Sequence, residues 1–127
     1  MVEKESLLTA LKSKSVSDVV VQRLIQMNAP LEERDGDRRT PLMLAARLGY
    51  TKIVGLLIDA KAFLNEKDKD GETALMMASS RDCVDFIDVL LEHRADINMV
   101  DVKGKTALMH AAADDKKNAV ERLIQGK

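Results

Sequence analysis

Residues 40–46 read T-P-L-M-L-A-A, residues 73–79 read T-A-L-M-M-A-S, and residues 106–112 read T-A-L-M-H-A-A. The threonines that open these phrases, Thr40, Thr73 and Thr106, stand 33 residues apart. A fixed period of this length is typical of a chain in which one small unit is repeated and stacked. Because stacked units bury their core between neighbours, such a chain is expected to act through its surface and not through an enclosed site.

Each unit is predicted to contain two short helices followed by a turn. Each threonine suits the N-cap, where its hydroxyl accepts from an otherwise unpaired helix N–H, and Pro41 suits the first helical turn. The second helix is indicated by Ile53, Val54, Leu57 and Ile58, whose spacing puts one apolar stripe on one face. Asp and Gly residues at 68–71 and 101–104 then favour a tight turn.

The period continues toward the N-terminus in a degraded form. Val20-Val21 align with Ile53-Val54, and the small pair Ala45-Ala46 is replaced by Lys12 and Ser13, as expected at the end of a stack. At the other end, charged residues separate Val120, Leu123 and Ile124, which indicates a closing cap. We therefore expect one domain over residues 1–127 with four copies, at about 5–39 (N-terminal cap), 40–72, 73–105 and 106–127 (C-terminal cap).

Composition narrows the class of protein. With 127 residues, 46% hydrophobic and 32% charged, the chain can fold as one compact domain. Its net charge of −1 and scattered basic residues argue against direct binding of nucleic acid or of an anionic membrane. Cys83 is the single cysteine, which excludes an internal disulfide and favours a reducing compartment. No leader and no apolar run of about 18 residues is present, so we expect an intracellular, soluble protein of the cytoplasm, with the nucleus as an alternative.

The period, the T-P-L-x-x-A-A phrase, the second-helix I-V-x-L-L and the following A-x-x-N together resemble ankyrin repeats, from about Glu5 to Gln125. The resemblance implies an all-α solenoid of stacked helix-turn-helix units with projecting β-turn or hairpin fingers. It also implies that the fingers and first helices form a concave surface that binds partner proteins.

The sequence departs from the family pattern at several positions. The family's usual histidine of the first helix is Met43, Met76 and Met109, for which we expect core packing, with partner recognition as the alternative. The glycine that often ends the second helix in a left-handed conformation is replaced by Asn28, Lys61 and Arg94. The glycine that ends the first helix is kept only as Gly49 and replaced by Asp82 and Asp115.

Two metal-like patterns are explained more simply by the repeat. Glu66, Asp68, Asp70 and Gly71 resemble the start of a calcium loop, but the residue that should be a bidentate Glu is Met77. His93, His110 and Cys83 lack the spacing of a zinc site. For Cys83 we expect a buried or half-buried thiol, with a redox role as the alternative, and for His110 a partly exposed place on the binding face. No catalytic or phosphate-binding motif is present, so we expect no enzyme, no metal and no cofactor.

Family resemblance locates the partner contacts on the fingers and on the first helices. The expected contact residues are Arg39, Leu44, Arg47, Leu48, Lys69, Asp70, Glu72, Met77, Ser80, Arg81, Val102, Lys103, Lys105, His110 and Asp114. Arginine beside apolar residues is the mixture that interface centres favour. We therefore expect a monomeric adaptor or scaffold for a protein or peptide with an acidic element beside an apolar anchor. The alternative is a stoichiometric inhibitor or regulator of an enzyme or transcription factor.

Overall fold

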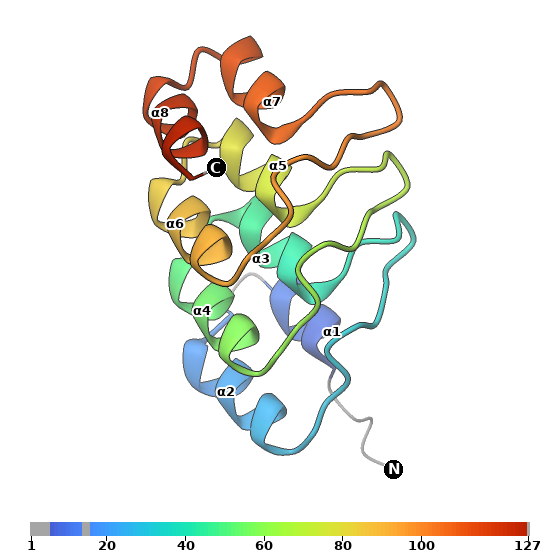
Figure 1. The fold of residues 1–127 in the computed structure, drawn as a ribbon. Helices are drawn as coiled ribbons and strands as arrows, with labels where there is room; N and C mark the ends of the chain where they lie inside the picture. Colours follow the sequence, from blue (N-terminus) through green and yellow to red (C-terminus); the bar gives the residue numbers. More distant parts are fainter. Residues whose placement is uncertain (1–5, 14–15, 127) are drawn as a thin grey trace.

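A computed structural model describes residues 6–13 and 16–126, which contain eight α-helices and no strand. The helices are α1 (Leu7–Lys12), α2 (Asp18–Gln26), α3 (Pro41–Leu48), α4 (Thr51–Asp59), α5 (Ala74–Ser80), α6 (Val84–Glu92), α7 (Ala107–Ala113) and α8 (Lys117–Gln125). The odd-numbered helices stack in one column and the even-numbered helices in a second, and the fingers project beyond the first column (Figure 1). This confirms the all-α solenoid. We propose that the four consecutive helix pairs are the four predicted copies.

The repeated threonines cap the first helices, as predicted. In each case the hydroxyl of Thr40, Thr73 or Thr106 accepts a hydrogen bond of 3.3 Å from the backbone N–H three residues later. Each cap fixes where its helix begins, because it satisfies a donor that the helix itself cannot pair. In the middle copy the backbone N–H of Thr73 also donates to Sδ of Met76 at 3.5 Å.

The predicted alignment of the first copy is wrong by one residue in its first helix, whereas α2 begins 33 residues before α4, as predicted. Ser6 caps α1 and stands 34, not 33, residues before Thr40. Leu11, which is 1% exposed, therefore takes the buried place of Ala45, and Lys12, whose side chain is 53% exposed, aligns with Ala46. The Nζ of Lys12 is 3.3 Å from Oδ2 of Asp35 in the first finger, so its charge is paired. The capping hydrogen bond of Ser6 and the burial of Leu11 therefore decide where α1 begins, and the exact 33-residue spacing does not.

Leucine and methionine at repeated positions form much of the core. Leu57, Leu90 and Leu123 recur at the period and are at most 1% exposed. Phe86 in α6 has the largest of the fully buried side chains and lies in the helix that packs against α4, α5 and α8. Packing between neighbouring pairs thus covers stripes that no single pair could bury.

The methionine prediction is confirmed for two copies and wrong for the third. Met43 and Met76 are each 1% exposed and pack in the core, but Met109 is 51% exposed. The difference arises because α7 is the last of the first-column helices that the structure describes, so no further helix covers its outer side.

Left-handed backbone occurs where the sequence departs from glycine. The predicted residues have φ between 55° and 81°: Asn28, Gly49, Lys61, Asp82, Arg94 and Asp115. Such a conformation costs a non-glycine residue about 1–2 kcal/mol. Arg38, with φ of 62°, was not predicted; it occupies the finger position of Gly71 and Gly104, which have φ of 76° and 78°.

One aspartate organises each finger. In Asp35, Asp68 and Asp101, Oδ1 accepts two backbone N–H groups at 2.9 Å, from the residues two and four positions later. Oδ2 faces a basic side chain: Lys12 at 3.3 Å, Arg39 at 3.7 Å and His110 at 2.8 Å, respectively. Burial opposes ionisation of Asp35 and Asp101, but these hydrogen bonds outweigh it and hold the pKa of both carboxyls below 3.8. The calcium-like loop is therefore a finger whose central carboxylate is already paired.

Neighbouring fingers are hydrogen-bonded to each other. The backbone N–H of Lys69 donates to the carbonyl of Asp37, and that of Val102 donates to the carbonyl of Asp70, each at 3.0 Å. These bonds hold the three fingers side by side along one edge of the stack, next to the first column of helices (Figure 1).

Candidate functional site

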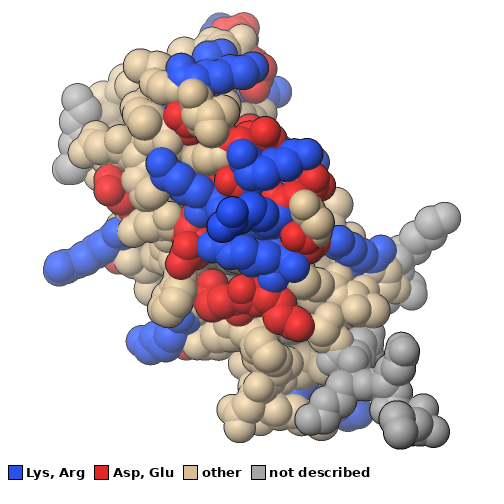
Figure 2. Space-filling model, turned by 90° about the vertical axis from the view of Figure 1, so that its right-hand side faces the viewer, with Lys and Arg blue, Asp and Glu red and all other residues tan. Residues whose placement is uncertain are grey.

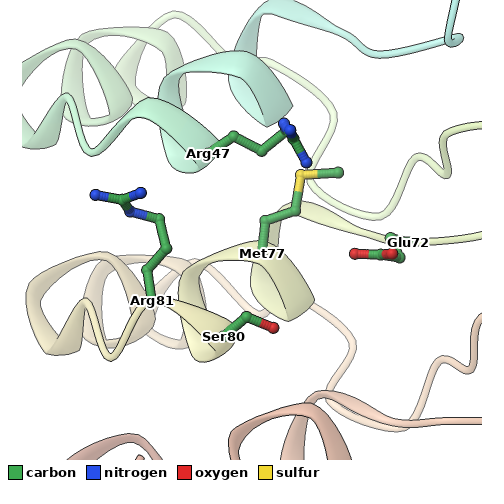
Figure 3. A pocket seen from close by; sticks show the side chains of 5 residues that line it. All are labelled: Arg47, Glu72, Met77, Ser80 and Arg81. Carbon is green, nitrogen blue, oxygen red and sulfur yellow. The ribbon is translucent and has the colours of Figure 1, made fainter. Parts of the chain in front are cut away.

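A pocket of about 210 Å³ lies where α3, α5 and the second finger meet. Its lining residues are Arg47, Glu72, Met77, Ser80 and Arg81, all of which belong to the predicted contact set. Arg47 comes from the last turn of α3, Met77 and Ser80 come from α5, and Arg81 is the C-cap of α5. Figure 3 shows Arg47 reaching toward the sulfur end of Met77, Glu72 on the finger side, and Arg81 rising from α5 toward α3.

The Arg81 guanidinium lies against a glycine at the end of α3. A Cβ on Gly49 would lie 3.1 Å from Nη2 of Arg81, closer than nine in ten real Cβ contacts. Gly49 has φ of 81° and is the C-cap of α3, so it both ends that helix and leaves room for the guanidinium. Arg81 therefore bridges from α5 to the end of α3 and lies near Arg47 at one pocket.

The two pocket arginines differ from Arg34, Arg39 and Lys69 of the fingers in having no side-chain partner among the described residues. Within residues 6–13 and 16–126, the guanidinium groups of Arg47 and Arg81 make no ion pair or hydrogen bond. Arg34, in contrast, pairs with Glu66 at 2.8 Å, and Lys69 pairs with Asp37 at 2.8 Å. Figure 2 shows this mixed surface on the finger side, where Lys and Arg gather in the middle with Asp and Glu around them. Unpaired positive charge therefore remains at the pocket.

Glu72 contributes a carboxyl group with a raised pKa to the same pocket. It is half-buried, and this burial raises its pKa above the ordinary value of 4.5. Asp68, Asp101 and Asp70 raise the pKa further, while His110 lowers it. The finger side of the pocket is therefore acidic, and the side formed by α3 and α5 is basic.

The Glu72→Gln variant is expected to be more stable than the parent chain at pH 7, by less than about 1 kcal/mol. A carboxyl whose pKa rises on folding costs stability above that pKa, and the cost disappears as the pH falls below its ordinary value of 4.5. Urea unfolding at pH 7 and at about pH 3.5 checks this, with exposed Glu121→Gln in α8 as the control. A destabilised Glu72→Gln at pH 7 would contradict the expected sign.

The other predicted contact residues are distributed over the fingers and helix ends. Lys69, Asp70, Val102, Lys103 and Lys105 are exposed on the fingers, Leu48 is 45% exposed on α3, and Asp114 is exposed at the end of α7. Arg39 and His110 are half-buried, and each lies beside a finger aspartate. Leu44 is 6% exposed and Met77 is 4% exposed, so both pack in the core. Only Met77 also lines the pocket, and we therefore leave Leu44 out of the contact surface.

Comparison with known families agrees with the period and the helix pairs. The family described as "Ankyrin repeats (3 copies)" matches residues 3–68 and 60–127. The chain belongs to the ankyrin repeat family. No curated protein matches the chain.

Ankyrin repeats are generally protein-protein interaction modules and are typically not enzymes. Among the residues that the structure describes, no group of three or more His, Cys, Asp or Glu side chains could hold a metal ion. Cys83 is half-buried at the N-cap position of α6, as predicted from its alignment with Tyr50. None of the described helices is both long and apolar enough to cross a membrane.

Sequence reasoning found the pocket residues of this ankyrin chain but not their arrangement. The motif shows that Arg39, Arg47 and Arg81 lie on one face, yet it cannot show which of them is neutralised. Arg39 is paired because Asp68 and Asp37 lie beside it in neighbouring fingers. The sequence does contain a sign of where Arg81 lies. Gly49 is the one position at which the glycine ending the first helix is kept, and the Arg81 guanidinium lies next to it.

Proposed function

We propose that this ankyrin chain is an adaptor or scaffold that binds a partner protein at the pocket formed by Arg47, Glu72, Met77, Ser80 and Arg81. The observation that carries the proposal is that two guanidinium groups without a partner among the described residues line a recess between α3 and α5, and that of Arg47 lies at the sulfur end of Met77. Arginine combined with apolar side chains is the composition found at the energetic centre of protein interfaces.

The chemistry of the pocket specifies the partner. A guanidinium binds a carboxylate through two parallel hydrogen bonds, so Arg47 and Arg81 favour an Asp or Glu of the partner. Met77 is 4% exposed but lines the pocket, so its polarisable thioether is the apolar contact for a side chain next to that acid. Glu72 repels a carboxylate that approaches from the finger side. The partner element is therefore an acidic residue adjoining an apolar anchor, with the acid directed toward α3 and α5.

The fingers form the rim of this interface. Most of their charges are paired with each other, as for Lys69 with Asp37, so they contribute little net attraction. Exposed Val102, Lys103 and Lys105 extend the rim toward the C-terminal end. A rim of this kind excludes water from the central contacts and adds orientation more than affinity.

The alternative function is that of an inhibitor of an enzyme or a transcription factor, which would use the same pocket. Only the identity of the partner distinguishes an adaptor from an inhibitor. For either role we propose an intracellular, cytoplasmic site of action, in keeping with the single, half-buried Cys83.

Methyl NMR of the methionines tests where the partner binds. The partner is first recovered from the native cell by affinity purification and mass spectrometry, and is then added to chain labelled with ¹³C at its seven methionine methyls. We expect the Met77 signal to shift or broaden while that of Met27, 70% exposed beyond the pocket, stays in place. An unchanged Met77 signal in a saturated complex would overturn the proposed site.

A further inference from the structure

Glu72 is a half-buried acid whose charge the described part of the chain leaves without a partner. It lines the same pocket as Arg47 and Arg81, but its carboxyl group makes no ion pair or hydrogen bond among the described residues. The finger aspartates Asp68 and Asp101, in contrast, each accept two backbone N–H groups and face a basic side chain. The contacts that hold the fingers together therefore do not explain why an acid stands at this position.

The surroundings of Glu72 make its negative charge unfavourable in the free chain. Its burial is the main cause of its raised pKa, because burial penalises the charged form. The charged or titratable groups around it are Asp68 and Asp70 of its own finger, Asp101 of the third finger, His110 of α7, and the pocket residues Arg47 and Arg81. A further cation beside Glu72 would favour its ionised form and remove this cost.

The acid lies on the opposite side of the pocket from Arg81. Figure 3 shows Met77 between Arg81, which rises from α5, and Glu72, which lies on the finger side. One period before and after Glu72 the fingers carry Arg39 and Lys105, so the acid occurs in the finger that lines the pocket and not at the aligned positions of its neighbours. The pocket thus offers a basic side, an apolar contact and an acidic side.

We propose that the partner carries a Lys or Arg that pairs with Glu72, on the far side of the apolar anchor from the partner's acid. This proposal rests on the proposed function, because the acid and the base would enter the same pocket. The binding element of the partner is therefore zwitterionic, and its acid, apolar anchor and base face the arginines, Met77 and Glu72, respectively. Glu72 then sets specificity twice, since it attracts the base and repels an element that has acids alone.

The variant Glu72→Gln separates this role from a structural one. The substitution is expected to stabilise the fold at pH 7, because it removes a half-buried charge. If Glu72 pairs with a base of the partner, the same substitution weakens binding. A residue that costs stability and contributes to binding is the trade-off expected at a functional site.

Selection from a library of random peptides displayed on phage tests the proposal. The full parent chain, Glu72→Lys and Arg47→Glu/Arg81→Glu serve as three separate baits at pH 7. We expect the parent chain to enrich peptides that combine Asp or Glu, an apolar residue, and Lys or Arg. The base should no longer be enriched on Glu72→Lys, and the acid should no longer be enriched on the arginine variant.

The outcomes distinguish the two proposals. Acids enriched through the arginines without any base would overturn the pairing with Glu72 and leave the proposed function standing. Bases enriched through Glu72 without any acid would support the pairing and overturn the acidic partner. A library that yields no peptide dependent on the pocket residues would overturn both.

Calorimetry with a selected peptide measures the pairing itself. We expect Glu72→Gln to weaken binding at pH 7 by about tenfold or more, while exposed Glu121→Gln in α8 leaves it unchanged. Replacing the base of the peptide by Met should cost a similar factor with the parent chain and little with Glu72→Gln, because the pair is already lost there.

The pH dependence gives a second readout of the same pair. The difference in affinity between the parent chain and Glu72→Gln should shrink as the pH falls toward 4.5, the ordinary pKa of a glutamate, because Glu72 then loses its charge. A Glu72→Gln variant that binds the peptide as tightly as the parent chain at pH 7, or more tightly, would overturn the proposal.

Discussion

Replacing Phe86 by alanine is expected to lower the free energy of unfolding by about 3–5 kcal/mol. Phe86 is 1% exposed and has the largest of the fully buried side chains. Its removal loses the transfer free energy of the ring and leaves a cavity that close-packed neighbours fill only in part. Domains of this size are typically stable by only about 5–15 kcal/mol, so the loss is a large share of the total.

The position of Phe86 in the stack makes the effect larger than its area alone suggests. Its helix, α6, packs against α4, α5 and α8, so a cavity there weakens the contacts of the third helix pair with both neighbouring pairs. In a solenoid these contacts between neighbours are the main source of stability, because a single pair does not fold alone. We therefore expect unfolding to begin at this pair in the variant.

The sequence contains a matched control for this prediction. Phe63, the other phenylalanine, is 61% exposed, so Phe63→Ala should change the free energy of unfolding by less than about 0.5 kcal/mol. Urea unfolding followed by circular dichroism measures both variants under the same conditions. Equal losses in the two variants would show that the assigned core is wrong.

The fold could be predicted because three independent local rules agree in every strong copy. The threonine caps, the apolar stripe of the second helix and the left-handed residues after the helices all follow from short-range physics, and each was confirmed. The first helix of the degraded copy was misaligned because the period alone cannot show that Ser6, and not Leu7, provides the cap.

What remained hidden from the sequence depends on contacts between distant residues. Arg38 is the exception, because its φ of 62° follows from the local turn around Asp35, and the aligned Gly71 and Gly104 signal it in the sequence. Met109 shares the motif position of Met43 and Met76, but only a covering neighbour decides whether that position is buried. Likewise, Arg39 forms ion pairs because the carboxylates of Asp37 and Asp68 lie beside it in the fingers. Arg47 forms none among the described residues.

The double variant Arg47→Glu/Arg81→Glu is expected to weaken partner binding by about 100-fold or more. Each substitution removes a charge-assisted hydrogen bond worth about 1.5–3 kcal/mol and adds repulsion toward the acidic element of the partner. Both side chains are exposed and make no ion pair within the described chain, so the fold should keep its stability. The control Arg23→Glu/Arg94→Glu makes the same change of charge at two exposed arginines outside the pocket.

The most direct test of the proposed binding site is the dissociation constant of the purified partner for these chains, measured by calorimetry at fixed ionic strength. We expect Arg47→Glu/Arg81→Glu to weaken binding by about 100-fold or more, while Arg23→Glu/Arg94→Glu stays within about threefold of the parent chain. A pocket variant that binds as tightly as the parent would contradict the proposal that the partner is held at Arg47 and Arg81 between α3 and α5.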